Sequence, residues 1–340
     1  MKTALITGIR GQDGAYLAQL LLEKGYRVVG TDRRKDDDTF WRLKSLGIDT
    51  EVETTFMDLL DMPNIFNVLR EFEPTEIYNL AAQSAVGTSF KAPYLTSDIN
   101  SMGVLRLLDG VRTILLEARF YQASSSEMFG KVQETPQKES TPFYPRSPYG
   151  VSKLFAHWMT INYRESYDMF NCSGILFNHE SPFRELGFVT RKITNTVARI
   201  KHGLADKLTL GNLDAQRDWG FAKEYVESMY LMLQQDTPDD YVIATGQTHS
   251  VRDFVTAAFA AVDITVEWQG SGVNEIGKDG ATGKTIVEVS REFYRPTEVD
   301  IVTGDPTKAY EKLGWKATMQ FSDLCGFMVE ADMRQVINEK

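Results

Sequence analysis

Three glycines near the start of the chain constrain its fold more than any other feature of the sequence. Gly8, Gly11 and Gly14 stand between a short apolar segment, residues 3–7, and a helical run, residues 15–24. Glycines at this spacing, after a strand and before a helix, allow a tight turn and let the backbone approach a pyrophosphate at the helix N-terminus. The alternative is an ordinary glycine-rich turn, but the flanking strand and helix favour a dinucleotide-binding turn.

Strand and helix patterns alternate through most of the chain. Apolar strand patterns follow at residues 26–31, 52–57, 76–81, 120–123, 172–177 and 241–244. This alternation is typical of an α/β protein with a Rossmann-type, doubly wound parallel sheet, which we predict as the fold class. Beyond residue 178 the alternation becomes irregular, which predicts a smaller, mixed α/β C-terminal substrate lobe.

This change of pattern divides the chain into two predicted domains. We expect the dinucleotide-binding domain at residues 1–177 plus about 215–249, and the substrate lobe at residues 178–214 and about 250–340. Within that lobe, the glycine-rich residues 269–284 are expected to form a mobile loop.

The composition excludes several classes of protein. A net charge of −10 argues against a general nucleic-acid binder, whose contacts need a basic face. Two cysteines and four histidines give neither a disulfide framework nor the spacing of metal ligands. The sequence has no signal peptide pattern and no apolar run long enough to span a bilayer, so we expect a cytoplasmic protein without a membrane partner.

A second informative stretch runs from residue 121 to residue 153. Ser125 and Glu127 follow a buried strand and are expected at its carboxyl end, where open α/β sheets place their chemistry. Ser147 is a good N-cap for the helix that follows. Tyr149 and Lys153 are four residues apart on that helix and can therefore reach one site.

The Tyr149–Lys153 spacing has a chemical use. An ammonium group beside a phenol favours the phenolate, which can take a proton from a sugar hydroxyl while hydride leaves the same carbon. By itself the spacing is a weak motif, because two common residues four apart usually lie on a solvated helical face. Other parts of the chain must support the catalytic interpretation.

The end of the second predicted strand bears on the choice of cofactor. Asp32 favours the free ribose hydroxyl of NAD, whereas Arg33 and Arg34 favour the 2′-phosphate of NADP. We predict NADP with weaker use of NAD, because two arginines outweigh one acid that can turn toward Arg34 or water. Asp58 and Leu59, at the end of the third predicted strand, suit an adenine contact.

Three cations in the second half of the chain are candidates for a phosphate site. Lys192, Arg217 and Arg295 are each typical of surface charges when taken singly. As a set they could hold a diphosphate, which guanidinium groups bind in bidentate fashion.

Two predicted helices, residues 100–116 and 149–164, are apolar nearly all round. A helix that is apolar on every side is expected to be buried on every side. Because the sheet covers only one face, we expect a partner subunit to cover the other.

The motifs in order resemble a known family. T-G-x-x-G-x-x-G, S-S-S-E, Y-x-x-x-K and R-P-x-E-V-D occur together in the extended short-chain dehydrogenase/reductase enzymes that act on nucleotide sugars. The segments F-N-H-E-S-P and R-D-W-G narrow the resemblance to the GDP-mannose 4,6-dehydratase family. The resemblance spans essentially the whole chain.

This resemblance implies a lyase reaction with an internal redox cycle. Tyr149, assisted by Lys153, would deprotonate the mannose 4-OH as hydride passes from C4 to the nicotinamide. Glu127 would remove the C5 proton and protonate the departing 6-OH, with Ser125 assisting at the 4-oxygen. Return of the hydride to C6 would give GDP-4-keto-6-deoxymannose.

The resemblance also implies a set of binding residues. Arg33 matches the family's arginine for the NADP phosphate. The complete cofactor assignment is Gly8, Gly11, Gln12, Asp13, Gly14, Asp32, Arg33, Asp58, Leu59, Ala81, Gln83, Tyr149, Lys153, His179 and Arg184. The assignment for GDP-mannose is Ser84, Asn178, Glu180, Lys192, Arg217, Arg295 and Glu298.

Two departures from the family pattern bear on cofactor and assembly. Asp32 replaces a small or apolar residue, and the charged residues 35–38 replace a serine-rich loop that contacts neighbouring subunits in tetrameric members. These departures weaken the inference of cofactor and tetramer from the resemblance. From the apolar helices and the resemblance together we expect a homo-oligomer, either a homodimer or the homotetramer that we favour.

Two alternatives to this functional interpretation remain. One is the same dehydration on another GDP-sugar such as a GDP-heptose. The other is a non-catalytic NADP-binding redox sensor, although such sensors characteristically lose the Tyr–Lys pair, which this chain retains.

Overall fold

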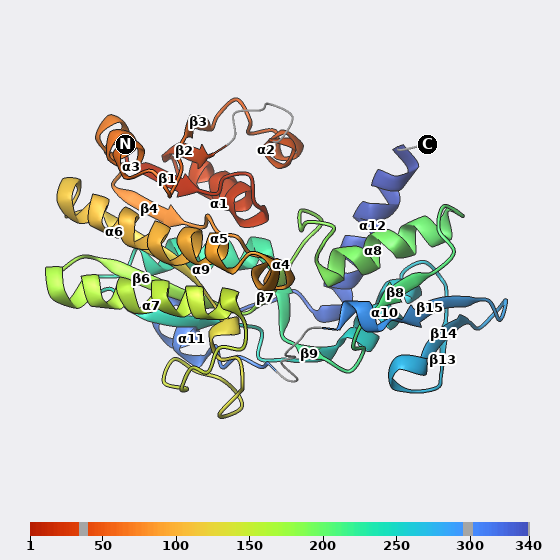
Figure 1. Ribbon diagram of the computed structural model, residues 1–340. Helices are drawn as coiled ribbons and strands as arrows, with labels where there is room; N and C mark the ends of the chain where they lie inside the picture. Colours follow the sequence, from red (N-terminus) through yellow and green to blue (C-terminus); the bar gives the residue numbers. More distant parts are fainter. Residues whose placement is uncertain (34–39, 295–301, 339–340) are drawn as a thin grey trace.

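The main body of the protein is a parallel sheet of seven strands (Figure 1). The computed structural model describes residues 1–33, 40–294 and 302–338. The strand order is β11-β6-β5-β4-β1-β2-β3. These strands are β1 (Thr3–Thr7), β2 (Arg27–Asp32), β3 (Glu53–Phe56), β4 (Glu76–Asn79), β5 (Arg119–Ser125), β6 (Asn171–Leu176) and β11 (Asp240–Ile243). The order changes direction between β1 and β4, so the predicted Rossmann-type, doubly wound fold class is confirmed.

Helices cover both faces of this sheet. Successive residues of a strand point to opposite faces, and Leu5 and Ile6 of β1 accordingly belong to two different cores. The core around Leu5 includes residues of α3 (Met62–Phe72), α6 (Gly103–Ile114) and α7 (Pro148–Tyr167). The core around Ile6 includes residues of α1 (Gln12–Glu23), α9 (Ala222–Met232) and α11 (Thr307–Leu313). Across the described ranges, no helix combines the length and apolar character that crossing a membrane requires.

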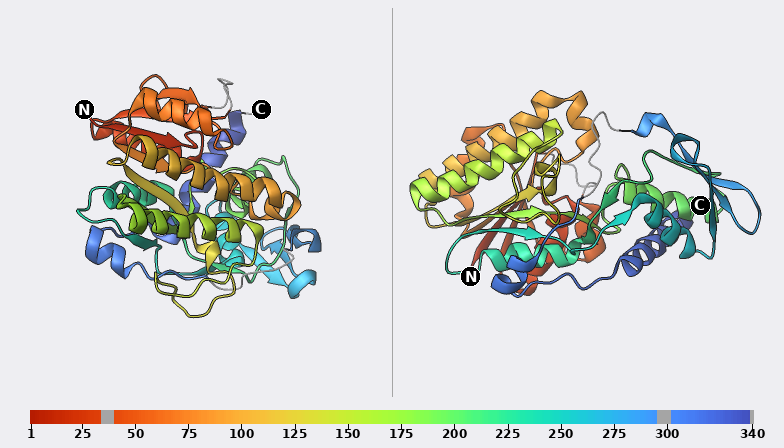
Figure 2. Two further views of the ribbon diagram at one scale, coloured as in Figure 1. Left: turned by 60° about the vertical axis from the view of Figure 1, so that its left-hand side comes forward. Right: turned by 90° about the horizontal axis from the view of Figure 1, so that it is seen from below.

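A second, smaller body lies beside the main sheet (Figure 2). Its sheet has the order β13-β14-β15-β8, and its strands are β8 (Leu208–Leu210), β13 (Val266–Gln269), β14 (Ile276–Asp279) and β15 (Thr285–Val289). Its helices are α8 (Val189–Lys201), α10 (Val251–Ala260) and α12 (Phe321–Asn338). They share a separate core around Phe254 and Phe259.

The predicted domain boundaries remain a prediction. One segment bears on them, because Ala309 and Leu313 of α11 pack into the core of the main body. Trp315 joins the same core, and its indole Nε1 donates to the carbonyl of Glu224 at 2.9 Å. The chain therefore returns to the main body inside the range that we predicted for the smaller lobe.

The expectation that residues 269–284 form a mobile loop is wrong. This stretch contains β14, which pairs antiparallel with both β13 and β15. A Cβ at Gly277 would lie 2.8 Å from Cγ1 of Val266 and 3.1 Å from Cβ of Val287. The glycine therefore allows close packing within the sheet, and its presence in the sequence did not indicate mobility.

The described residues leave one face of α7 exposed. Val151, Phe155 and Trp158 lie along one side of the helix and are 55%, 38% and 54% exposed. Met102, directly before the neighbouring helix α6, is 41% exposed. The two helices are therefore buried on their inner sides only, and the predicted subunit contact remains a proposal.

We expect the substitution Trp158→Asp to separate this contact. A charge on the apolar stripe of α7 would have to be desolvated in a subunit interface, which is costly without a partner. Light scattering should show a dimer or larger assembly for the wild type at micromolar concentration and a smaller species for the variant.

Ile337→Asp is the matched control, since Ile337 is 52% exposed on α12, away from α7 (Figure 1). It should assemble like the wild type. A strictly monomeric wild-type protein would contradict the proposed contact.

Candidate active site

The turn between β1 and α1 is as tight as its glycines predict. Gly8 has a φ of +72°, and a Cβ there would lie 3.0 Å from the backbone of Ala81. A Cβ at Gly14 would lie 2.5 Å from the carbonyl oxygen of Gly8. The backbone N–H of Gly11 donates to that oxygen at 3.0 Å and closes the turn. Side chains at these positions would push the first turn of α1 away from the sheet.

A cavity of about 610 Å³ opens at this turn. It brings together many of the residues that we assigned to the cofactor, and one assigned to the substrate. The assigned residues in its wall are Gly8, Gly11, Gln12, Asp13, Gly14, Asp32, Arg33, Asp58, Leu59, Ala81, Gln83, Ser84 and Arg184. The first turn of α1 lines it and offers unpaired backbone N–H groups, which suit a phosphate. The residues present therefore fit a dinucleotide.

Arg10 is a residue of this cavity that the sequence analysis missed. Its Nε lies 3.5 Å from Oδ2 of Asp32, and both side chains are mostly buried. The guanidinium also lies 4.8 Å from the ring centroid of Phe40. Asp32 pairs with Arg10. The expectation that Asp32 turns toward Arg34 or water stays a prediction, because Arg34 lies outside the described residues. The position of Arg10 inside the glycine motif was the available signal.

The predicted catalytic group lies at the carboxyl end of β5 and the start of α7. Ser147 caps α7, because its Oγ accepts from the backbone N–H of Gly150 at 3.0 Å. Tyr149 and Lys153 are both buried, and the Lys153 ammonium lies 5.9 Å from the Tyr149 ring centroid. The same ammonium donates to the carbonyl of Ala123 in β5 at 2.8 Å. The helix cap and the sheet thus fix both side chains.

Ser125 and Glu127 complete this group. The Ser125 side chain lies close enough to Tyr149 to lower the pKa of its phenol. Its Oγ also accepts from the backbone N–H of Glu127 at 3.2 Å. The structure therefore brings the four predicted catalytic residues to one end of the sheet.

Burial controls the charge of the two central groups. Desolvation raises the pKa of Tyr149 to about 12, although the Ser125 side chain opposes this rise, and the Glu127 charge adds to it. Desolvation also lowers the pKa of Lys153 to about 8. The predicted effect of the lysine on the phenol is thus outweighed by the cost of burying a phenolate.

Asn100 is a second residue that the sequence analysis did not assign. It lies in a short π-helical turn, η2 (Asp98–Met102), and is 1% exposed. Its Nδ2 donates to Oγ of Ser152 at 3.2 Å and to the carbonyl of Gln83 at 3.0 Å, and its Oδ1 accepts from the N–H of Gln83 at 2.8 Å. Asn100 therefore holds the loop after β4 against α7. No sequence pattern marks a π-turn, although such turns are frequent at functional sites.

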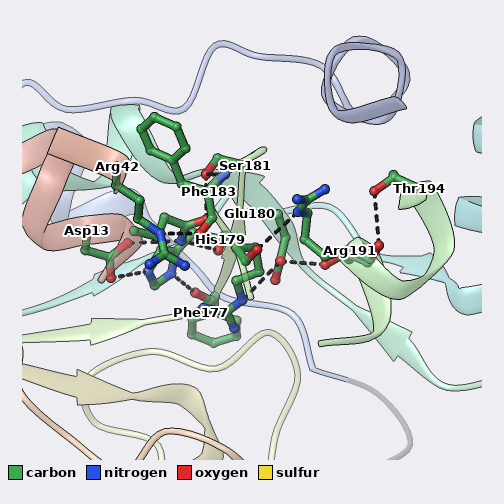
Figure 3. Close-up of polar contacts among 12 residues, drawn as sticks. Asp13, Arg42, Phe177, His179, Glu180, Ser181, Phe183, Arg191 and Thr194 are labelled. Atoms are coloured by element: carbon green, nitrogen blue, oxygen red, sulfur yellow. Dashed lines mark hydrogen bonds and ion pairs between the residues drawn. The ribbon is translucent and has the colours of Figure 1, made fainter. Parts of the chain in front are cut away.

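Of the residues assigned to the substrate, four lie outside the wall of the cofactor cavity: Asn178, Glu180, Lys192 and Arg217. Asn178 and Glu180 belong to β7 (Asn178–Glu180), which pairs with β10 (Trp219–Phe221). Glu180 is 2% exposed, accepts from Oγ1 of Thr190 at 2.6 Å and pairs with Arg184 at 3.2 Å (Figure 3). Its carboxylate is thus already engaged by protein groups.

The assigned cations have different surroundings. The Lys192 ammonium lies 3.4 Å from the ring centroid of Phe293, and desolvation lowers the pKa of Lys192. Arg217 is 8% exposed and donates to the carbonyl of Gln216 at 2.8 Å. Arg295 and Glu298 lie outside the described residues. The predicted diphosphate set is therefore described only in part.

Solved structures share this fold. RMD from Pseudomonas aeruginosa, complexed with NADPH, matches with a TM-score of 0.76 and 20% identity over 98% of both chains. The dTDP-glucose 4,6-dehydratase of Bacillus anthracis, in complex with NAD, matches with a TM-score of 0.80 and 18% identity over 98% of this chain and 97% of that one. Fold and glycine turn together define a dinucleotide-binding protein of the Rossmann type.

Sequence comparison identifies the family within this class. The family described as GDP-mannose 4,6 dehydratase matches residues 5–328. The human GDP-mannose 4,6 dehydratase is 52% identical in an alignment 338 residues long, gaps included, that covers 97% of this chain and 91% of the relative. The GDP-mannose 4,6-dehydratase of Yersinia enterocolitica is 51% identical in an alignment 352 residues long, gaps included, that covers 98% of this chain and 95% of the relative. The chain belongs to the GDP-mannose 4,6-dehydratase family.

Proposed function

We propose that the protein converts GDP-mannose to GDP-4-keto-6-deoxymannose by oxidation at C4, elimination of water across C5 and C6, and return of the hydride to C6. The observation that carries this proposal is the position of Glu127 at the end of β5, beside Ser125 and Tyr149. Oxidation and reduction need only the tyrosine and lysine, whereas elimination needs a further acid and base. Glu127 provides that group.

Each residue of the group has a defined role in this proposal. Tyr149 takes the proton of the 4-OH, and Ser125 holds the 4-oxygen through a hydrogen bond. A bound nicotinamide cofactor supplies the acceptor, and later the donor, of the hydride. Glu127 removes the C5 proton, which the C4 ketone has made acidic, and passes it to the departing 6-OH, which leaves as water. When the hydride returns to C6, C5 takes up one proton, which balances the proton that Tyr149 took from the 4-OH.

Lys153 offsets part of the cost of ionising the buried phenol of Tyr149. Because burial raises the pKa of Tyr149 to about 12, ionisation at neutral pH needs positive charge close by. The Lys153 ammonium provides it at 5.9 Å from the ring centroid, on a side chain that the Ala123 carbonyl holds in place. This requirement separates the proposed enzyme from a redox sensor, in which neither residue would be needed.

We propose NADP as the preferred cofactor. The pair between Arg10 and Asp32 supports this choice, since it neutralises the acid that would repel a 2′-phosphate. Arg33 is exposed and lines the same cavity, where it is available to that phosphate. NAD use should be weaker. A homodimer or homotetramer and a cytoplasmic location are also part of the proposal.

The substitution Glu127→Gln tests the division of tasks. It should lower water loss by about 10²- to 10⁴-fold, the range typical of a lost general acid or base, while C4 oxidation continues. Reduced cofactor should therefore accumulate on the enzyme. Mass spectrometry of the sugar product and absorbance of the nicotinamide, after incubation with GDP-mannose and catalytic NADP, measure the two steps separately.

Glu117→Gln is the matched control, because Glu117 is an exposed acid near the opposite end of β5. It should behave like the wild type. Near wild-type dehydration by the Glu127 variant would remove this residue from the mechanism, and dehydration of a GDP-heptose in preference to GDP-mannose would change the proposed substrate.

The charge of Lys153 predicts a pH dependence of the first step. Because its pKa is about 8, the ammonium is present below this pH and is lost above it. The rate of C4 oxidation should therefore fall as the pH rises through about 8. Stopped-flow measurement of cofactor reduction across pH 6–10 tests this expectation.

Lys153→Arg keeps its charge throughout that range, since the pKa of arginine lies above about 12. Whatever activity it retains should lack the fall near pH 8, whereas Lys153→Met should be slow at every pH. An unchanged fall in the arginine variant would assign the pH dependence to another group.

The pair between Arg10 and Asp32 predicts non-additive effects on cofactor binding. Removal of Arg10 should weaken NADP binding, because it leaves the Asp32 carboxylate facing the phosphate. In an Asp32→Ala background, the same removal should cost less. Calorimetric titration of NADP and NAD into the wild type, both single variants and the double variant gives the coupling free energy.

Arg33→Ala should weaken NADP binding more than NAD binding, in contrast to Asp32→Ala, which should weaken NAD binding more. Tighter binding of NAD than NADP by the wild type would show that Asp32 governs the site despite Arg10.

A further inference from the structure

The imidazole of His179 lies between two acceptors. Its Nδ1 lies 2.7 Å from the carbonyl oxygen of Phe177, and its Nε2 lies 2.8 Å from Oδ2 of Asp13 (Figure 3). One face of the ring stacks on Tyr225, with centroids 4.9 Å apart and an interplanar angle of 22°. His179 is 8% exposed. Both ring nitrogens are therefore committed to protein groups, although we had assigned this residue to the cofactor.

The geometry determines the protonation of the ring. A carbonyl oxygen and a carboxylate both accept hydrogen bonds, so both ring nitrogens must donate, and only an imidazolium does so. The neutral ring would keep one N–H and place a lone pair against one of the two oxygens. Burial alone would lower the pKa of His179, but the Asp13 carboxylate outweighs it, and the net shift is upward.

The partner carboxylate is ionised. Burial would raise the pKa of Asp13, but the His179 charge and hydrogen bonds from His179 and Gln12 lower it below its usual value. Asp13 and His179 thus form an imidazolium–carboxylate pair. Apart from Asp13, the charged or titratable groups that face the ring are Arg184, from the segment after β7, and Tyr225, from α9.

This pair joins two segments with different tasks. Asp13 belongs to the first turn of α1, at the cofactor cavity, and His179 is the central residue of β7, between Asn178 and Glu180. Gln12 strengthens the same junction. Its Nε2 donates to the carbonyl of His179 at 3.1 Å, and its Oε1 accepts from Oγ of Ser181 at 2.7 Å.

We propose that Asp13 and His179 form a charged clasp that positions the first turn of α1 against β7, and that cofactor affinity depends on the proton held by this clasp. His179 is then a positioning residue and not a direct ligand. When its proton is lost, Nε2 presents a lone pair to the Asp13 carboxylate, and the junction opens. This inference rests on the proposed function only in taking a nicotinamide dinucleotide as the ligand of the cavity.

The sign of the pH effect follows from the pair. A histidine whose pKa is raised in the folded protein contributes fully below the unfolded value of 6.5, and its contribution is lost as the pH rises through the raised value. Cofactor affinity should therefore be highest near pH 6 and decline toward pH 9.

The variant Asp13→Asn separates this role from simple packing. The asparagine side chain can accept from, or donate to, a neutral imidazole, so the junction persists without a titrating pair. Calorimetric titration with NADPH is done on the wild type and the variant at pH 6, 7, 8 and 9. The cofactor phosphate and Lys153 also titrate, but they do so in both proteins. Dividing the wild-type affinity by the variant affinity at each pH therefore removes their effect.

We expect this ratio to favour the wild type by about tenfold at pH 6, as for one charge-assisted hydrogen bond, and to approach one at pH 9. His179→Gln, which cannot titrate, should show the same loss of pH dependence. Tyr225→Phe should keep the wild-type profile, because no group in the described part of the chain hydrogen-bonds to its hydroxyl and its ring stack is retained. A ratio that is constant with pH would overturn the clasp and leave a packing role.

A readout without cofactor tests the protonation directly. The chain has four histidines, so ¹⁵N labelling of their rings gives a small set of NMR signals, and His179→Gln assigns the one of interest. At pH 6.5 both ring nitrogens of His179 should be protonated in the wild type, and one in Asp13→Asn.

A neutral ring in the wild type would overturn the proposal. If the imidazolium is present but NADPH does not bind at any pH, the proposed cofactor is wrong and the charged pair remains. The two failures are therefore distinguishable.

Discussion

The close approach of α1 to the ends of β1 and β4 is the contact on which the site depends. Gly8 permits it against the backbone of Ala81, and Gly14 permits it against the carbonyl of Gly8. Because the strand order changes direction between β1 and β4, this approach brings the helix N-terminus to the edge of the sheet where a crevice forms. The same edge receives the end of β5 and the start of α7. This one backbone contact therefore places the cofactor cavity beside the candidate catalytic residues.

Directional polar contacts fix the segment that follows β7 against the main body, and others fix the packing inside the smaller body. Arg42 donates to the carbonyls of Phe183 and Arg10, both at 2.7 Å, and so connects the glycine turn to the segment after β7. Further along, the fully buried Asp332 of α12 pairs with Arg191 and accepts from Thr194 of α8. Buried polar groups lose much of their stabilisation when they are displaced, so such contacts specify one arrangement where an apolar surface would tolerate several.

Features that local sequence determines were predictable, and those that depend on burial or distant packing were not. The glycine turn, the Ser147 cap and the alternation of strands are local, and each was found. The π-turn around Asn100 and the pair between Arg10 and Asp32 depend on residues outside their own segments. The strand around Gly277 depends on pairing with the two strands beside it, which the glycines of this stretch do not indicate. The high pKa of Tyr149 has the same origin, because the sequence shows the nearby lysine but not the extent of desolvation.

The inner and outer sides of helix α7 carry different kinds of residue. Tyr149 and Lys153 face inward beside β5, while Val151, Phe155 and Trp158 face outward. If a second copy covers the outer stripe, the helix that carries the proton-transfer groups also forms part of the subunit interface. Dilution would then lower turnover per chain without unfolding any chain, because separated copies would leave α7 supported on one side only. Assays at constant substrate over a wide range of protein concentration would reveal this, since a specific activity independent of dilution requires the two sides to act separately.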